Sequence, residues 1–274
     1  MTTTTRAHGW QLQEDSASAY EGYLVPLLFD EGARDLLDRL EVASGERVLD
    51  LACGTGIVAR HAAPRVGPDG EVTGVDVNPG MLEVARQASA RERASVRWEE
   101  ASADALGLPD ASVDVACCQQ GLQFFGDRGA ALAELHRVTA PGGRLGLSVC
   151  RSLEHQPGYV PLVAALRRHV GEPAAEGMAS PFAFGDRDRV RALVRDAGFR
   201  DVEVRIAVWP VRLDSPEAFL FGETASSPLG EVISGLDADV VDALLADLAD
   251  GLEPHTDDAG LAFPLESLVV TAVR

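Results

Sequence analysis

Val-Leu-Asp-Leu-Ala-Cys-Gly-Thr-Gly, residues 48–56, is the stretch that decides the fold of this 274-residue chain. The apolar run over 47–51 predicts a strand, the small residues of 52–56 predict a tight turn, and the residues from Ile57 onward predict a helix. Glycine tolerates unusual backbone conformations and lets a ligand lie against bare backbone. The free N–H groups at a helix start attract polar ligand atoms. The pattern therefore predicts a nucleotide-type site.

The glycine spacing distinguishes between kinds of nucleotide site. The dinucleotide fingerprint G-x-G-x-x-G fails, because no third glycine follows Gly54 and Gly56 at the required distance. A phosphate-binding loop needs a lysine, and all 24 basic residues here are arginine. Instead, Asp50 precedes the turn, where an acid repels phosphate and suits a cation. S-adenosylmethionine (SAM) carries both a sulfonium and an ammonium group, and it fits this pattern.

A second carboxylate falls where the same ligand needs one. Residues 71–76 read as the next strand, which ends in Asp76, 20 residues after Gly56. An acid at the end of the second strand of a Rossmann-like fold takes ribose hydroxyls. Asn78 and Pro79 suit the N-cap and the first position of the helix that follows.

With these motifs the sequence resembles the class I SAM-dependent methyltransferases, and most closely the ubiquinone/menaquinone-biosynthesis-like group of small-molecule methyltransferases. The matching stretches keep the family's order over about residues 40–150. They are 48–56, 74–78 (Gly-Val-Asp-Val-Asn), 103–109, 112–115 leading to 119–125 (Gln-Gln-Gly-Leu-Gln-Phe-Phe), and 134–143. Five motifs in register support the fold and the cofactor, whereas they are silent on the methyl acceptor.

The resemblance assigns cofactor roles to the matching residues. The methionine moiety would be held by the acid and the turn, that is by Asp50, Ala52, Cys53, Gly54, Thr55 and Gly56. The ribose and adenine would be held by Asp76, Val77, Asn78 and Met81, and the adenine amine by Ala103, Asp104 and Ala105. The methionine side would be lined by Gln119 and Gln120, and the cofactor would be covered by Tyr23 or Tyr20.

These residues also have structural interpretations. Asp50 can cap the helix that follows it, Asp76 can be a plain turn residue, and Asp104 can be an exposed loop acid. Gln119 and Gln120 can be polar groups that end a strand. The choice between the two interpretations depends on whether the residues converge on one cavity.

Composition excludes several classes of partner. The chain has 43 acidic and 24 basic residues, a formal charge of −19. Nucleic acids and anionic membranes both need basic contacts, so neither is an expected partner. No apolar run of transmembrane length and no signal-peptide core is present, which predicts a cytoplasmic protein. The expected partner is a small-molecule acceptor, and no spacing indicates a metal site.

Alternating strands and helices predict an α/β fold, a Rossmann-like doubly wound sheet of seven mostly parallel strands. The resemblance makes the last strand antiparallel, beside the sixth. Strands are expected near 47–52, 71–76, 94–99, 113–118, 143–150, 201–208 and 267–273. The core would comprise 41–150, a helix and strand in 186–213, and the final strand in 261–274. A mainly helical substrate lid would comprise 1–40, 151–185 and 214–260 and cover the carboxyl ends of the strands.

The expected activity is methyl transfer to a small molecule, with oxygen favoured over carbon or nitrogen. The acceptor would be a quinone-like, aromatic or polyketide-like metabolite, within an apolar wall drawn from Phe182, Phe184, Trp209, Phe219 and Phe221. A base is needed only when the acceptor loses a proton, and His155 and His8 are candidates unless they are solvent-exposed loop residues. The alternative is a methyltransferase-like protein that uses SAM structurally, as a cyclase or a non-catalytic biosynthetic partner.

Overall fold

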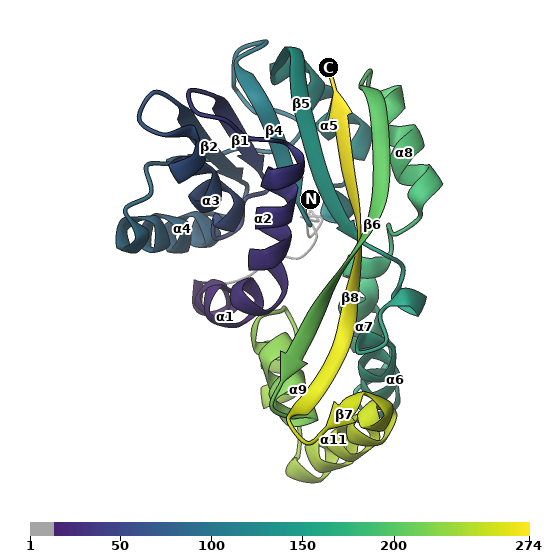
Figure 1. Cartoon of the computed structure of the whole chain (residues 1–274). Helices are drawn as coiled ribbons and strands as arrows, with labels where there is room; N and C mark the ends of the chain where they lie inside the picture. The colour runs from purple at the N-terminus through teal and green to yellow at the C-terminus, as the bar shows by residue number, and fades with distance from the viewer. Residues whose placement is uncertain (1–13) are drawn as a thin grey trace, which may run out of the picture.

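Five parallel strands and one long antiparallel pair form the sheet of this protein, a computed structural model that describes residues 14–274 (Figure 1). The strands are β1 (Arg47–Leu51), β2 (Glu71–Asp76), β3 (Arg97–Glu100), β4 (Val113–Gln119), β5 (Thr139–Cys150), β6 (Arg200–Leu213), β7 (Thr256–Asp257) and β8 (Gly260–Val273). Their order is β3-β2-β1-β4-β5-β8-β6, and β8 runs antiparallel to β5 and β6. The predicted seven-stranded topology is confirmed, and the two-residue β7 adds a short hairpin with β8.

Helices cover both faces of this sheet. They are α2 (Asp30–Arg39), α3 (Ile57–Val66), α4 (Pro79–Glu92), α5 (Arg128–Val138) and α8 (Arg187–Asp196). The apolar sides of α2 and α3 pack on one face, against side chains such as Val48 and Val115. Those of α5 and α8 pack on the other face, against Leu49 and Leu147. The central strands β1, β2 and β4 are buried on both faces along most of their length, as their nearly continuous apolar runs require, whereas the outer strands β3 and β6 are partly exposed.

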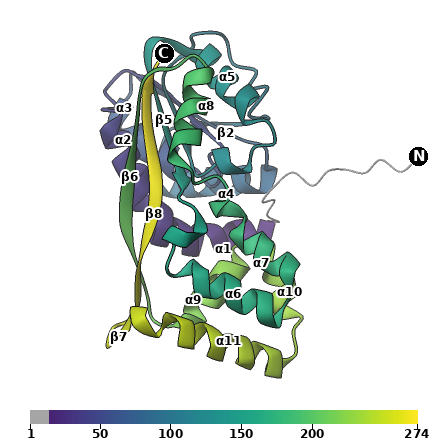
Figure 2. The same ribbon diagram turned by 90° about the vertical axis from the view of Figure 1, so that its right-hand side faces the viewer.

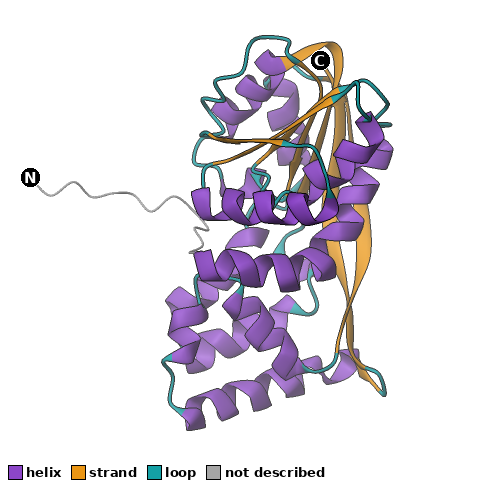
Figure 3. Ribbon diagram, turned by 90° about the vertical axis from the view of Figure 1, so that its left-hand side faces the viewer, coloured by secondary structure: helices purple, strands orange, loops and turns teal. Residues whose placement is uncertain are grey.

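A second, helical body lies beyond the carboxyl ends of the parallel strands (Figures 2 and 3). It contains α1 (Glu14–Leu24), η1 (Val25–Phe29), α6 (Tyr159–His169), α7 (Glu172–Ala179), α9 (Pro216–Ala225), α10 (Gly230–Ser234) and α11 (Ala238–Leu252). Short turns of helix are η2 (Leu122–Phe124), η3 (Leu153–His155), η4 (Ser180–Phe182) and η5 (Glu253–His255). Three stretches far apart in sequence share one apolar core here, which includes Leu24, Leu162, Phe219 and Leu248.

The strands β6 and β8 are longer than the sequence predicts. Strands were expected over 201–208 and 267–273, whereas the observed pairing continues from Arg200 opposite Val273 to Leu213 opposite Leu261. The extra turns of ribbon leave the sheet and enter the helical body (Figure 1). There Leu261 is buried against the helices, so the extension gains apolar burial that its own sequence window does not reveal.

Every helix in the described part of the chain is too short or too polar to pass through a bilayer.

Candidate functional site

A cavity of about 500 Å³ opens at the carboxyl ends of β1, β2 and β4. This is the edge at which an open α/β sheet binds its ligands. Its walls come from α1, the β1 turn, the β2 end, the loop after β3 and the loop after β4. They are Tyr20, Leu51, Ala52, Gly54, Asp76, Val77, Asn78, Met81, Ala101, Ser102, Ala103, Asp104, Gln119, Gln120, Gly121, Phe124, Phe125, Gly126 and Asp127.

The turn after β1 is shaped by left-handed backbone conformations. Ala52 has φ of 54°, Gly54 of 54° and Gly56 of 85°. The turn is tied to β2, because Cys53 N donates to Val75 O at 3.0 Å. An added Cβ at Gly54 would meet nothing closer than the Tyr20 ring at 3.9 Å, so the backbone there faces open space. Such a turn presents bare backbone to a ligand.

Asp50 is a buried carboxylate beside this turn, only 1% exposed. The backbone N–H of Ala59 in α3 donates to its Oδ2 at 3.0 Å, and no cation in the described residues forms an ion pair with it. Burial, reinforced by the nearby charge of Asp76, raises the pKa of Asp50 to about 7. The helix-cap interpretation is therefore half correct: Asp50 does accept a helix N–H, yet it also lines a cavity.

Asp76 ends β2 and organises two loops at once. Its Oδ2 accepts the backbone N–H of Gly54 at 2.8 Å, and its Oδ1 accepts that of Asn78 at 2.9 Å. Burial raises the pKa of Asp76, although these backbone donors partly oppose the rise. Asn78 then caps α4 by accepting from Gly80 N and Met81 N, as the sequence predicts. The carboxylate is thereby fixed at the cavity wall.

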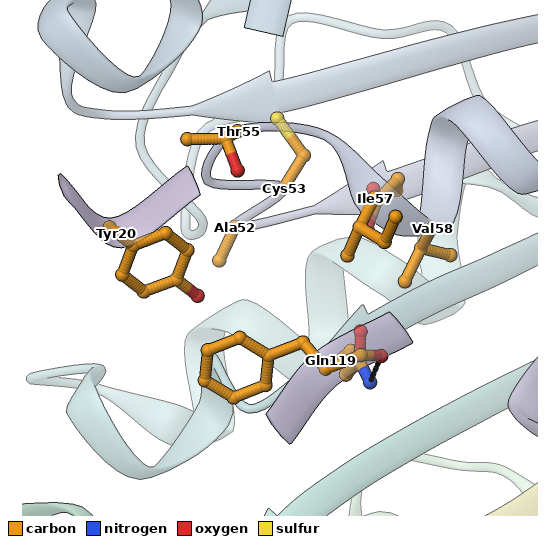
Figure 4. Close-up of a pocket in the computed structure, with 9 residues that line it drawn as sticks. Tyr20, Ala52, Cys53, Thr55, Ile57, Val58 and Gln119 are labelled. Atoms are coloured by element: carbon orange, nitrogen blue, oxygen red, sulfur yellow. Dashed lines mark hydrogen bonds between the residues drawn. The ribbon is translucent and has the colours of Figure 1, made fainter. Parts of the chain in front are cut away.

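A smaller cavity adjoins the larger one under Tyr20 (Figure 4). Its walls are Tyr20, Phe29, Asp50, Ala52, Cys53, Thr55, Ile57, Val58 and Gln119. In Figure 4 the Tyr20 hydroxyl points toward the space between the turn and Gln119. The ring of Tyr20 stacks on Phe29 with centroids 5.3 Å apart. Thr55 Oγ1 is buried here with no hydrogen-bond partner among the described residues, so a polar group is ready for a ligand.

The electrostatic character of the two cavities is acidic. Their walls contain Asp50, Asp76, Asp104 and Asp127, and no arginine or histidine. Asp50 is buried and Asp76 largely so, whereas Asp104 and Asp127 are exposed. Buried carboxylates without a nearby cation favour a positively charged ligand, which would offset their mutual repulsion. The residues present therefore fit the ammonium and sulfonium groups of SAM and oppose a nucleotide phosphate.

Three glutamines at and just after the end of β4 form side-chain hydrogen bonds. Gln119 Nε2 donates to Phe29 O at 3.0 Å, which ties the loop to the N-terminal helices. Gln120 has φ of 54°, and its Nε2 donates to Ser267 Oγ in β8 at 3.0 Å. Gln123 Nε2 donates to Gln120 Oε1 at 3.0 Å. Gln119 and Gln120 thus have the structural role considered from sequence and also line the cavity.

Most residues predicted to bind the cofactor meet at these two cavities. The larger cavity contains Ala52, Gly54, Asp76, Val77, Asn78, Met81, Ala103, Asp104, Gln119 and Gln120. The smaller one adds Asp50, Cys53 and Thr55. Motifs that are separated by as many as 70 residues converge because the carboxyl ends of parallel strands share one edge of the sheet.

The structure does not place Tyr23, Gly56 or Ala105 on either cavity. Tyr23 instead donates its hydroxyl to the carbonyl of Ala218 in α9 at 3.4 Å, and Tyr20, one turn earlier, takes the position over the cofactor turn. Gly56 lies under the indole of Trp98. A helix turn separates the two tyrosines, and only the packing of α1 decides which of them faces the cavity.

His155 also lies outside both cavities. It ends η3, and Arg151 Nη2 donates to its Nε2 at 2.8 Å. Because arginine can only donate, this ring nitrogen acts as acceptor and is engaged. His8 lies outside the described residues. The structure therefore gives no support to His155 as the base for an acceptor in these cavities.

Several wall residues were not assigned from the sequence. Phe124, Phe125 and Asp127 follow β4 and line the larger cavity, and Phe29 joins Tyr20 in the smaller one. The signal for the first group was available, since Phe124 and Phe125 end the motif at 119–125 and Asp127 follows it closely. Phe29 and Tyr20 come from the N-terminal segment, whose docking on the sheet is a tertiary property.

A family profile described as a methyltransferase domain matches residues 48–143. Demethylmenaquinone methyltransferase from Geobacillus kaustophilus is 36% identical over 186 residues, which are 62% of this chain and 78% of the relative. The chain belongs to the class I SAM-dependent methyltransferases. Within them it falls in the ubiquinone/menaquinone-methyltransferase-like group, and its cofactor is SAM.

Two further comparisons describe the range of this methyltransferase's relatives. Aklanonic acid methyltransferase DauC from a Streptomyces species is 34% identical over 169 residues, which are 59% of this chain and 76% of the relative. The crystal structure of SpnF, a (4+2) cyclase, has a TM-score of 0.55 and 21% identity, and the match covers 98% of this chain and 87% of that one. The likeness to SpnF concerns the fold alone.

Proposed function

We propose that this SAM-dependent small-molecule methyltransferase methylates an oxygen of an aromatic, quinone-like or polyketide-like acceptor. The observation that carries the cofactor assignment is the buried, unpaired carboxylate of Asp50 beside the glycine turn. When bound, SAM supplies an electrophilic methyl group. The task of the chain is to hold the acceptor atom in line with that group and to exclude water.

The cavity walls suggest how the cofactor is held. Asp50 and the 52–56 turn face the smaller cavity and suit the methionine ammonium, and Thr55 Oγ1 offers an additional hydrogen bond. Asp76 is fixed by two backbone donors and suits the ribose diol. Asp104 lies on the loop after β3 and suits the adenine amine. Tyr20, rather than Tyr23, is the residue proposed to cover the methionine end.

Two kinds of relative favour an aromatic acceptor. The relatives are named for demethylmenaquinone and aklanonic acid, so a ring-bearing acceptor is the class proposed for this chain as well. Phe124 and Phe125 in the lining of the larger cavity offer apolar walls that suit a ring. Oxygen is the acceptor atom that we propose, ahead of carbon or nitrogen.

The cofactor assignment predicts that SAM affinity depends on pH. Asp50 must be ionised to pair with an ammonium, and the pKa of Asp50 in the free protein is about 7. We therefore expect the dissociation constant for SAM to fall by up to about tenfold for each pH unit as the pH rises toward 7. Above pH 7 it should level off. Calorimetry in buffers of different ionisation enthalpy will show one proton released on binding at pH 6.

The isosteric variant Asp50→Asn is the test of that assignment. It should bind SAM more weakly at pH 8 and show a flat pH profile, because the titrating group is gone. Asp127→Asn is the matched control and should keep the wild-type profile, because Asp127 is exposed and its Oδ1 caps α5 by accepting from Ala130 N, a bond that an asparagine oxygen can also accept. A wild-type pH profile in Asp50→Asn would remove Asp50 from the cofactor site.

The activity itself is tested by S-adenosylhomocysteine release. Wild-type protein with SAM and a panel of phenols and hydroquinones should release one S-adenosylhomocysteine per methylated product. Tight SAM binding with no release from any acceptor would favour the alternative role, in which SAM is held structurally as in a cyclase or a non-catalytic partner. The likeness of the fold to SpnF motivates that comparison.

A further inference from the structure

Polar side chains gather where β4 ends, beside the larger cavity. Gln120 Nε2 donates to Ser267 Oγ in β8, and Gln123 Nε2 donates to Gln120 Oε1, both at 3.0 Å. Ser267 is fully buried, and Gln123 is 5% exposed. Gln123 Oε1 and Ser148 Oγ are buried with no hydrogen-bond partner among the described residues. Burying polar groups is costly, above all when some stay unsatisfied, so this cluster needs a functional explanation.

The cluster holds the Gln120 side chain against a strained backbone. Gln120 has φ of 54°, a left-handed conformation that costs a residue with a side chain about 1 kcal/mol. Its backbone N–H donates to the carbonyl of Ser148 in β5 at 2.9 Å, which fixes this conformation. Strain of this kind persists only where the surrounding structure enforces it, and it concentrates at ligand sites. The loop thus holds the Gln120 amide in one orientation.

The Gln120 amide retains hydrogen-bonding capacity. A primary amide has two N–H donors and an oxygen with two lone pairs. Within residues 14–274, the bonds with Ser267 and Gln123 use one N–H and one lone pair. Gln120 is half-buried and lines the larger cavity. A ligand in that cavity can therefore accept the second N–H.

The order of the strands separates the place of the acceptor from that of the cofactor. The proposed cofactor residues follow β1, β2 and β3, and the sheet runs in the order β3-β2-β1-β4. With adenine at Asp104 and methionine at the 52–56 turn, the cofactor fills the cavity from the β3 side to the β1 side. The wall from Gln120 to Asp127 follows β4, across the turn from the adenine end. That wall is left for the acceptor.

Gln120 also lies close to the methionine end of the cavity. Its neighbour Gly121 packs on the cofactor turn, because an added Cβ there would lie 2.6 Å from Ala52 Cβ and 3.6 Å from the Phe125 ring. Its other neighbour, Gln119, lines both cavities. A ring that lies against Phe125 can therefore bring one oxygen to the methyl group and a second oxygen to Gln120.

We propose that Gln120 is a specificity-determining residue whose second N–H donates to a carbonyl oxygen of the methyl acceptor, next to the reacting hydroxyl. This rests on the proposed function. The acceptor is then a hydroxylated ring with a neighbouring carbonyl, as in a hydroxyquinone or an acylated phenol. Hydroxyl groups find hydrogen-bond acceptors in the acids of this cavity, whereas a carbonyl oxygen needs a donor, which Gln120 supplies. Gln123 and Ser267 touch Gln120 and act as positioning residues.

The experiment compares two probe acceptors, 2-acetyl-1-naphthol, which carries the carbonyl, and 1-naphthol, which lacks it. Release of S-adenosylhomocysteine by the full chain gives kcat and KM for each probe. Gln120→Met keeps the side-chain length and the backbone strain but loses the N–H. We expect it to raise the KM for 2-acetyl-1-naphthol about fivefold, the effect of one lost hydrogen bond. The KM for 1-naphthol should change by less than about twofold.

Ser267→Ala tests the positioning role. The variant removes the partner of the first N–H of Gln120 and leaves the second N–H in place. We expect a smaller rise in the KM for 2-acetyl-1-naphthol, with kcat and the KM for 1-naphthol unchanged. A merely structural serine would affect both probes alike, and that result would contradict its positioning role.

Further measurements distinguish the possible failures. Gln87→Met, on the exposed side of α4, is the control and should behave as wild type. SAM binding by calorimetry should be unchanged in Gln120→Met. Weaker SAM binding in that variant, an equal rise of KM for both probes, or a wild-type KM that is no lower for 2-acetyl-1-naphthol than for 1-naphthol overturns the role of Gln120.

A second variant keeps the test decisive if Gln120→Met does not fold. Gln120→Glu retains an oxygen for Gln123 and lacks the N–H, so it should show the same selective rise in KM. A wild-type protein that binds no SAM, or that releases no S-adenosylhomocysteine with any acceptor, refutes the proposed function instead.

Discussion

Gly56 shows how single residues set the cofactor turn. Its φ of 85° is one that side chains disfavour, and an added Cβ would lie 2.2 Å from the Trp98 ring. Two constraints thus act at one position, and neither involves the ligand. Ala52 adopts φ of 54° and holds its Cβ against Gly121. The resemblance to relatives identified the turn, whereas backbone geometry explains why its residues are small.

Gly56→Ala should therefore lower the free energy of unfolding much more than the same substitution at Gly45, where the backbone strain is similar. Gly45 has nearly the same φ, 83°, with nothing within 4 Å of an added Cβ. We expect Gly45→Ala to lower the free energy of unfolding by about 1 kcal/mol through backbone strain. Gly56→Ala adds a steric clash, for a total of about 3 kcal/mol. Urea denaturation of both variants measures the difference, and equal losses would show that Trp98 moves aside.

At the scale of elements, one buried arginine connects the N-terminal helix to the sheet. Arg60 in α3 has a side chain 3% exposed, and its Nη2 donates to Glu21 in α1 at 2.8 Å. Its Nη1 donates to Glu92 in α4. Glu21 adjoins Tyr20, which covers the cofactor turn. The ion pairs therefore fix α1 over the site, a contact between segments that no sequence window contains.

Replacing Arg60 by methionine should release α1 and destabilise the protein. The variant leaves Glu21 without its cation, and we expect a loss of about 3 kcal/mol. This expected loss lies at the low end of the range for breaking a buried ion pair, because Glu92, the second partner of Arg60, is half exposed. Arg65→Met, which breaks the more exposed pair with Asp38 on the same helix, should cost about 1 kcal/mol or less. Chemical denaturation and proteolysis at α1 measure both, and equal losses would contradict the role of Arg60.

At the scale of the whole molecule, the helical body and the sheet each bury a carboxyl group. Glu223 lies in the first, and Asp50 lies at the edge of the second. Both have a folded pKa above the unfolded value, so folding favours their protonated forms. The stabilisation that the protonated forms provide is therefore fully present below about pH 4. It is lost as the pH rises through about 7 for Asp50 and about 8 for Glu223.

The ligand-free protein should become less stable from about pH 5 to pH 8. Each of the two carboxyls lowers the free energy of unfolding by about 1.4 kcal/mol per pH unit over its window. His136 acts in the opposite sense below pH 6.5, because burial lowers its pKa. Urea denaturation across this range should show the decline, and the double variant Asp50→Asn, Glu223→Gln should reduce it to the share of Asp76, whose pKa is also raised by burial. An unchanged slope in that variant would assign the decline to other groups.

The sequence by itself determined the mostly parallel core and the cofactor turn with its acids at Asp50 and Asp76, and the family resemblance added the antiparallel last strand. These follow from local rules, because apolar runs, glycines and caps act within a few residues of one another. The tertiary structure decided what faces the site from outside that core. The choice of Tyr20 over Tyr23, the long β6–β8 ribbon and the hydrogen bond from Gln120 to Ser267 depend on packing between distant segments. Such contacts gain their energy only when the whole chain is assembled, so no local pattern records them.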